Sequence, residues 1–112
     1  MDIVQPDVAK VGGLSEMRRI AWLAQDFDIE LVPHGWNTAI GLAADLQLVS
    51  TVPGRTFVEF NFGNKLIDEL AGEPFRLDAD GCLTIPSGPG FGISIDRERL
   101  QGFCSSPAAR EI

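Results

Sequence analysis

Several familiar signals are missing from this chain of 112 residues. No apolar run approaches the roughly 20 residues that a helix needs to cross a bilayer, and the first residues lack the basic and apolar regions of a signal peptide. The 9 Lys+Arg residues, set against 16 Asp+Glu, form no basic run that would attract nucleic acid. We therefore expect a cytoplasmic protein that binds neither membranes nor nucleic acid.

Cysteine and phosphate-binding motifs are equally sparse. Cys82 and Cys104 are far apart and match no CxxC or zinc spacing, so we interpret them as free thiols of a reducing cytosol, without an assigned role. The G-x-G-x-x-G fingerprint is absent. The run 88–92 resembles it superficially, but no helix follows directly and Pro89 removes an amide donor. This run is interpreted as a structural turn.

What the chain does contain is an alternation of strand and helix patterns. Expected strands cover residues 2–5, 29–32 and 56–60, and expected helices cover residues 17–27 and 39–50. Ser15 and Thr38 are the expected N-caps. The buried faces follow the three-to-four spacing of apolar residues, which are Met17, Ile20, Ala21, Leu23, Ala24 and Phe27 in one helix and Ile40, Leu42, Ala43, Leu46 and Val49 in the other. This pattern is typical of a parallel α/β sheet.

The rhythm changes after residue 60. A short helix is expected within residues 61–71, followed by a hairpin of residues 75–80 and 82–85 around the turn signal Asp80–Gly81. A last helical turn is expected from Asp96 to Leu100, and residues 102–112 are expected to form a flexible tail.

The first strand begins at residue 2 with nothing before it to cover it, although apolar parallel strands are normally buried on both faces. We interpret the pattern as the last three strands of a barrel, which typically needs about 250 residues. A complete small α/β protein is the alternative.

Three polar residues fall at or near strand ends, where a parallel barrel displays its active site: Asp7, His34 and Glu59. Asp7 and His34 are 27 positions apart, which places them on neighbouring strand ends. A carboxylate there would accept a hydrogen bond from one imidazole nitrogen and raise the basicity of the other. Glu59 would form a hydrogen bond with a substrate oxygen. The structural alternatives are a solvated histidine, an aspartate that only closes a turn, and a glutamate that faces solvent.

Four motifs together resemble one known family. They are Gln5–Glu16, Pro33–Asn37, Val58–Glu59 and Asp80–Ile93, and they resemble, in order and spacing, the end of mandelate racemase/muconate lactonizing enzymes of the enolase superfamily. The resemblance extends to about Leu100. It implies that residues 1–60 correspond to the sixth to eighth strands of a (β/α)₇β barrel. It also implies that residues 61–101 return toward a capping domain.

The resemblance also implies roles for individual residues. Asp7 and His34 correspond to the acid–base dyad of the mandelate racemase branch, and Glu59 to the glutamate that contacts the substrate carboxylate. Trp36, two residues from His34, and Lys10, in a D-x-x-K pattern, are candidate substrate-binding residues. For Lys10 a structural salt bridge is an equal alternative, and for Trp22 and Trp36 a place in the core or a pocket wall is the simplest interpretation.

The implied function belongs to a Mg²⁺-dependent parent enzyme that removes the proton α to the carboxylate of a small acid. A sugar-acid dehydratase is the first hypothesis, and a racemase, epimerase or cycloisomerase is the second. The family's metal ligands lie on earlier strands, so neither a metal site nor activity is expected for the 112 residues alone. A third hypothesis is a non-catalytic remnant that self-associates, and a homo-oligomer is expected.

Overall fold

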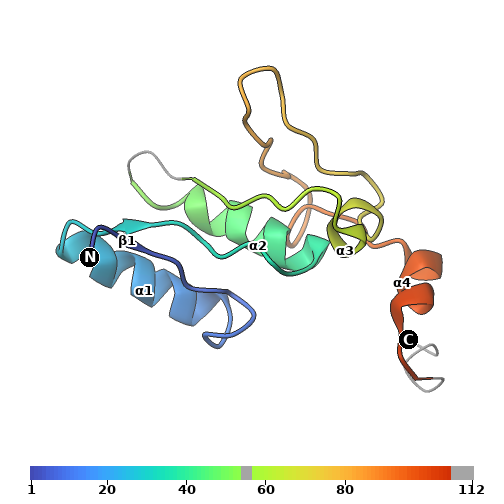
Figure 1. Cartoon of the computed structure of the whole chain (residues 1–112), viewed down its shortest axis with the longest axis horizontal. Coiled ribbons are helices and arrows are strands. Elements are labelled where there is room, and N and C mark those ends of the chain that lie inside the picture. The colour runs from blue at the N-terminus through green and yellow to red at the C-terminus, as the bar shows by residue number, and fades with distance from the viewer. Residues whose placement is uncertain (54–56, 107–112) are drawn as a thin grey trace.

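The computed structural model describes residues 1–53 and 57–106. Two short strands and four helices follow one another along the chain (Figure 1), namely β1 (Ile3–Val4), α1 (Leu14–Asp26), β2 (Glu30–Leu31), α2 (Ala39–Val49), α3 (Lys65–Asp68) and α4 (Arg97–Phe103). In the described part of the chain, none of these helices combines the length and apolar character needed to cross a bilayer.

The parallel pairing of β1 with β2 confirms the first two predicted strands. Its hydrogen bonds continue beyond the short assigned strands. The amide of Glu30 donates to Asp2 O (3.0 Å), that of Val32 to Val4 O (3.0 Å) and that of His34 to Pro6 O (2.9 Å). The ladder therefore ends with Pro6 beside His34, and it sets Asp7 next to the histidine.

A third strand was predicted at residues 56–60. For residues 57–60, which the structure describes, this prediction is wrong. Residues 57–60 pair with no strand, and residue 56 lies outside the described residues. The segment instead runs against Gly35, where an added Cβ would lie 1.9 Å from Glu59 O. The side chain of Glu59, rather than its backbone, bonds the amide of Gly35, so no ladder forms between the two segments.

Helix α1 begins earlier than predicted, with Gly13 and not Ser15 as its N-cap. Gly12 and Gly13 have φ angles of 104° and 93°, a region that a serine side chain would enter only with strain. The two glycines therefore complete the turn and Leu14 starts the helix.

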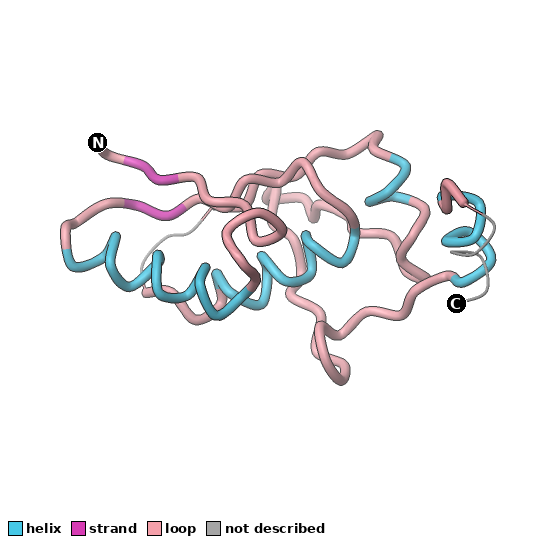
Figure 2. The backbone as a smooth tube through the Cα atoms, turned by 90° about the horizontal axis from the view of Figure 1, so that it is seen from below, coloured by secondary structure: helices cyan, strands magenta, loops and turns pink. Residues whose placement is uncertain are grey.

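The buried face of α1 is narrower than predicted. Met17, Ala21 and Ala24 are buried, whereas Leu23 and Phe27 are 59% and 69% exposed. Trp22 is also exposed, so its predicted place in the core is wrong. The reason is that α1 packs on one side only, against the two strands and α2 (Figure 2), and a single stripe is enough to fill that contact.

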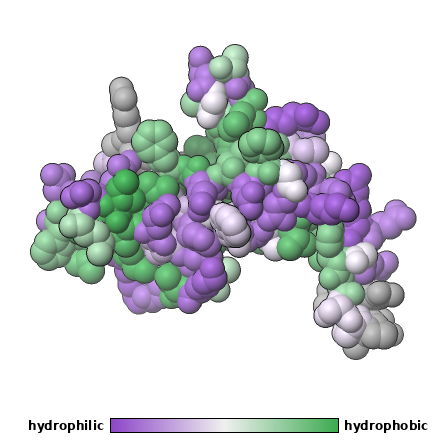
Figure 3. Space-filling model, in the orientation of Figure 1, coloured by the Kyte–Doolittle hydropathy of each residue, from purple (hydrophilic) through white to green (hydrophobic). Residues whose placement is uncertain are grey.

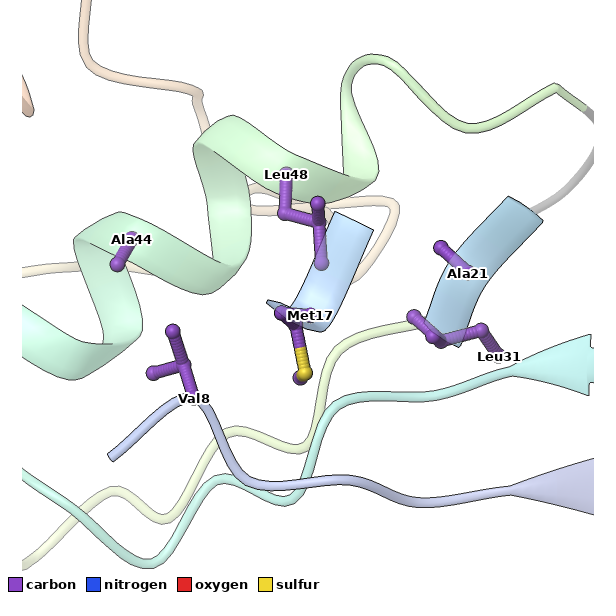
Figure 4. Close-up of a cluster of buried hydrophobic side chains, with 6 residues drawn as sticks. All are labelled: Val8, Met17, Ala21, Leu31, Ala44 and Leu48. Atoms are coloured by element: carbon purple, nitrogen blue, oxygen red, sulfur yellow. The ribbon is translucent and has the colours of Figure 1, made fainter. Parts of the chain in front are cut away.

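Helix α2 is the centre of the hydrophobic interior. Its predicted N-cap Thr38 is confirmed, since Thr38 Oγ1 accepts from the amide of Gly41. Ala44 and Leu48 join the cluster shown in Figure 4, together with Val8, Met17, Ala21 and Leu31. Other residues of α2 join two further clusters, Ala39 in one and Leu42 with Leu46 in the other. Ile40, predicted to be buried, is 41% exposed, because these contacts use the other faces of the helix.

The C-terminal half contains less regular structure than predicted. The expected hairpin turn is present, but its strands reduce to one bridge, Leu77 opposite Leu83. The segment arches away from the helices (Figure 1), so few neighbours hold it in a sheet. Asp96 caps α4 as expected, and α4 continues to Phe103, beyond the expected end at Leu100. The predicted flexible tail thus begins inside α4, and its residues 107–112 lie outside the described residues.

The surface mixes hydrophobic and hydrophilic side chains without separation into large single-character faces in the view of Figure 3. Among the described residues, fourteen large hydrophobic side chains are exposed, Ile3, Trp36, Phe57 and Phe62 among them. Such side chains are common on protein surfaces singly, but here they occur on nearly every element.

Substitution of Met17 tests the packing of the cluster in Figure 4. Met17→Ala removes a fully buried side chain and is expected to lower the free energy of unfolding by about 2–5 kcal/mol, because it leaves a cavity. Leu23→Ala, on the exposed side of the same helix, is the control and should change it by less than about 0.5 kcal/mol. Urea unfolding followed by circular dichroism measures both. Equal losses for the two variants would contradict the described packing.

Candidate functional site

Asp7 is fixed by its own turn at the end of the β1 segment. Its Oδ1 accepts from the amide of Ala9 (2.9 Å), and its backbone oxygen accepts from the amides of Lys10 and Val11 (2.9 and 3.0 Å). Aspartate is favoured in such turns because its short side chain bonds the backbone two residues on. The side chain is 5% exposed, so Asp7 is held in one orientation.

Asp7 and His34 are in direct contact, as their spacing predicts. Asp7 Oδ2 lies 2.9 Å from His34 Nδ1. An ionised carboxylate can only accept, so Nδ1 carries a proton, and in the neutral tautomer this leaves Nε2 as the acceptor nitrogen. The His34 side chain is 34% exposed, so the ring is reachable from solvent while its partner is buried.

Lys10 forms the second contact of the same oxygen. Its Nζ lies 2.7 Å from Asp7 Oδ2, and its side chain is 69% exposed. This contact is the structural ion pair that the sequence offered as one interpretation of Lys10. A substrate-binding role for Lys10 stays a prediction.

The partners of Asp7 also set its charge. Burial raises the pKa of Asp7, but hydrogen bonds from Lys10, His34 and the amide of Ala9, together with the charge of Lys10, outweigh burial and hold the pKa below its ordinary value of 3.8. Asp7 is therefore ionised at neutral pH, as the hydrogen bond to Nδ1 requires.

Glu59 joins this site through the residue after His34. Its Oε2 accepts from the amide of Gly35 at 2.8 Å. The close backbone approach at Gly35 excludes any side chain there. The three residues predicted at strand ends are thus brought together, although Glu59 lies in a segment that is not a strand.

Trp36 is not in the core. Its side chain is 68% exposed, and it follows Gly35 on the loop that bears His34. The predicted role in substrate binding stays a prediction, since the described residues place no substrate against it.

Asp45, a buried carboxyl on α2, was not among the residues predicted from the sequence. Asp45 is 0% exposed, and Asn37 Nδ2 donates to its Oδ2 at 3.4 Å. Burial raises the pKa of Asp45 to about 7, against the hydrogen bond from Asn37, with smaller effects from the charges of Asp7 and His34. The available signal was one acidic residue in the otherwise nearly apolar run 39–49.

Metal-binding side chains do not gather in residues 1–53 and 57–106. Within these ranges no three His, Cys, Asp or Glu residues form a group that would hold a metal ion. The chemistry of the donors therefore does not fit a Mg²⁺ site. A hollow of about 650 Å³ lies elsewhere, under the arch of residues 73–94, with Glu73, Phe75, Arg76 and Ser94 in its lining.

Comparison with known proteins gives consistent matches. The family model described as "Enolase C-terminal domain-like" matches residues 1–99. The D-galactarolactone cycloisomerase of Agrobacterium fabrum (strain C58) is 37% identical over 92% of the chain. The D-galactonate dehydratase of Variovorax paradoxus (strain S110) is 32% identical over 94%. The chain spans 29% of the length of each of these relatives.

Solved structures agree with these matches. The mandelate racemase/muconate lactonizing enzyme from Jannaschia sp. CCS1 superposes with a TM-score of 0.81 at 27% sequence identity, covering 93% of this chain and 26% of that one. The expected resemblance and the expected fold family are both confirmed.

Replacement of Asp7 by Asn tests the charge of the dyad. Because the pKa of Asp7 lies below 3.8 in the folded chain, its stabilisation is present above that pH and is lost as the pH falls through the folded value. We expect Asp7→Asn to lower the free energy of unfolding by about 1–3 kcal/mol at neutral pH and the difference from wild type to shrink in acid.

Urea unfolding at a series of pH values measures this difference. Asp80→Asn, at an exposed turn position, is the matched control and should change stability little. A variant at position 7 that is as stable as wild type at neutral pH would contradict the assignment.

Proposed function

The chain belongs to the enolase C-terminal domain-like family, and from this premise we propose that Asp7 and His34 serve an enzyme that moves the proton α to a carboxylate. The observation that carries the proposal is the 2.9 Å contact between Asp7 Oδ2 and His34 Nδ1. That contact leaves Nε2 of a partly exposed ring as a base. The relatives named above are a cycloisomerase and a dehydratase, which supports this class of reaction.

In this proposal His34 Nε2 accepts or returns a proton at the substrate. When Nε2 takes the proton the ring becomes a cation, and the adjacent carboxylate of Asp7 stabilises that cation. General acid–base catalysis of this kind contributes roughly 10²–10⁴-fold to a rate. Glu59 Oε2 already accepts from the amide of Gly35, so Oε1 is the oxygen free for substrate. Oε1 would form the hydrogen bond with a substrate carboxylate oxygen as negative charge develops there.

Dehydration of a sugar acid is the reaction that we favour. After loss of the α proton, departure of the β-hydroxyl as water completes the elimination, and protonated His34 would give its proton to that hydroxyl. The relative from Variovorax is named for a dehydration. Return of the proton to the α-carbon would give racemisation or epimerisation. Departure of a ring oxygen from the β-carbon, in place of a hydroxyl, would open the ring without loss of water and give cycloisomerisation, and the Agrobacterium relative is named as a cycloisomerase. We propose a cytoplasmic enzyme acting on a small sugar acid, with Trp36 and Lys10 at the substrate.

The proposed parent enzyme uses Mg²⁺, which would supply positive charge to stabilise the enediolate. The described side chains of this chain do not fit such a site, so no step above is assigned to the metal. Its ligands would be contributed by residues other than these.

Self-association is a second candidate role, favoured by the exposed edge of β1. In the described part of the chain, β1 has one neighbouring strand, and Ile3 is 50% exposed. Such an edge presents backbone groups to another chain. In this second proposal the chain forms a homo-oligomer through this edge.

Assay of an enzyme that contains this segment tests the first proposal. Incubation with a panel of sugar acids in D₂O should give a 2-keto-3-deoxy acid and solvent deuterium in the product. His34→Asn should reduce turnover by at least about 10²-fold, because the base is lost. Trp22→Phe, on the exposed face of α1, is the control and should leave turnover unchanged.

The products separate the alternatives. Deuterium at the α-carbon of an otherwise unchanged acid would indicate a racemase or epimerase, and a ring-opened isomer formed without loss of water would indicate a cycloisomerase. Full turnover by His34→Asn would contradict the dyad proposal itself.

Sedimentation equilibrium of the 112-residue chain tests self-association. We expect a mass above that of the monomer that increases with concentration. Since the backbone groups of Asp2 and Val4 face β2, those of Ile3 face the open edge. Ile3→Pro should therefore lower the mass by blocking that edge, whereas Ile3→Val should not. A wild-type chain that is monomeric at every concentration would exclude this role.

A further inference from the structure

We propose that Asp45 is held as a neutral carboxylic acid, paired with the carboxamide of Asn37, and that this pair positions the loop that presents His34. The proposal deepens the function proposed above, because it assigns a positioning residue to the same site. Asp45 belongs to α2 and does not reach the reacting atoms in this proposal. Its role is to hold the residues that do.

Hydrogen-bond donors and acceptors do not balance if Asp45 is ionised. Asn37 Nδ2 donates to Asp45 Oδ2 at 3.4 Å. The other oxygen of each group, Asn37 Oδ1 and Asp45 Oδ1, is buried and lacks a hydrogen-bond partner in the described part of the chain. Both of these atoms are acceptors when the carboxyl is ionised, so neither can satisfy the other.

A single proton on Asp45 corrects this imbalance. An O–H at Asp45 Oδ1 would donate to Asn37 Oδ1, while Asn37 Nδ2 continues to donate to Asp45 Oδ2. The acid and the amide then form a closed pair of two hydrogen bonds. Buried polar groups are rarely left unpaired, so the proton explains two orphaned atoms together.

The charges around Asp45 favour the same state. Asp45 is fully buried, and Asp7, whose charge acts on it, is itself ionised. Burial and the charge of Asp7 raise the pKa of Asp45, while Asn37 and His34 act in the opposite direction, and the result is a pKa of about 7. Two ionised carboxylates close to one imidazole would repel each other, and a neutral Asp45 avoids this.

Helix α2 provides the space that the pair requires. Gly41 lies one turn before Asp45 on the same face of the helix. A Cβ at Gly41 would lie 2.5–2.7 Å from the carboxamide atoms of Asn37, so only glycine lets the amide lie against the helix there. The absence of a side chain at position 41 thus allows Asn37 to reach Asp45.

The loop of residues 33–38 is fixed at several points, and its side chains attach it to α2 through the cap at Thr38 and through the acid–amide pair. On the strand side, the amide of His34 donates to Pro6 O. On the side of residues 57–64, the amide of Gly35 donates to Glu59 and Asn64 Nδ2 donates to the backbone oxygen of Asn37 at 3.3 Å. Loss of the pair would free the loop on one side and let His34 move relative to Asp7.

Two substitutions of Asp45 show whether its role depends on the two hydrogen bonds of a neutral group or only on the volume of its side chain. Asp45→Asn is neutral and its amide can form the same two hydrogen bonds, whereas Asp45→Leu fills a similar volume and can form neither. In the wild type, the contribution of Asp45 to stability should be fully present below the ordinary pKa of 3.8 and should be lost as the pH rises through about 7. Asp45→Asn should abolish this fall in the urea midpoint, and Asp45→Leu should lower the midpoint at every pH.

Carbon-13 and nitrogen-15 NMR of the full chain supplies the readouts that a structural role alone would not move. The Asp45 carboxyl signal of the wild type should titrate with a midpoint near 7. The His34 Nδ1–H signal should be retained in Asp45→Asn and shifted or broadened in Asp45→Leu. An Asp45 carboxyl that is ionised throughout the range from pH 4 to 7, or an Asn variant as disrupted as the Leu variant, would overturn the proposal.

Gly41→Ala breaks the pair without altering either partner. The added methyl group would displace the Asn37 amide, so the His34 Nδ1–H signal should shift as it does in Asp45→Leu. Gly102→Ala in α4, where an added Cβ meets no atom within 4 Å, is the matched control and should leave the signal in place. An unchanged signal in Gly41→Ala would overturn the positioning role. None of these measurements depends on turnover, so a failure of the enzyme assay would leave them interpretable.

Discussion

The parallel pairing of residues 2–6 with residues 30–34 is the constraint on which the rest of the structure depends. Its ladder of amide-to-carbonyl bonds continues to His34 and Pro6, and Asp7 follows at the next position. A slip of one residue would turn every side chain of one strand to the opposite face, removing Leu31 from the core and His34 from its carboxylate. Packing and the dyad therefore depend on one register, so that the hydrophobic pattern of β2 also specifies the site.

Helix α2 connects the paired strands to the rest of the chain through its packing. It contributes buried residues to all three hydrophobic clusters, and its first turns hold the loop that leaves β2. Thr38 caps the helix, Gly41 gives room for the amide of Asn37, and Asp45 receives that amide. A helix that is buried nearly all round can hold an adjacent loop rigidly, because it has little freedom to move itself. The packing of the core thus fixes the position of the loop that carries His34.

Local signals predicted the first two strands, the two long helices, the cap at Thr38 and the contact of Asp7 with His34. Each depends on period, cap chemistry or strand order, which short stretches of sequence contain. The failures depend on tertiary context. Residues 57–60 have the sequence pattern of a strand. In the structure they lie against Gly35 without backbone pairing, so they do not join the sheet. Phe27 and Trp22 look like core residues, but the helix that carries them packs on one side only. Asp45 is one acidic residue in a helix, and only its burial shows that it is unusual.

Burial of Asp45 beside the dyad has a consequence for the charge of the site. The pKa of Asp7 is held below its ordinary value by its partners, whereas burial raises the pKa of Asp45 to about 7. Between about pH 4 and pH 7 the two carboxyl groups are thus driven toward different protonation states by their surroundings, a separation found where acid and base roles are divided. The single negative charge then lies on the residue that touches Nδ1. A second charge on α2 would act on the dyad only through space, because Asp45 contacts Asn37 and not His34, and the neutral form of Asp45 leaves Asp7 as the charged carboxylate of the pair.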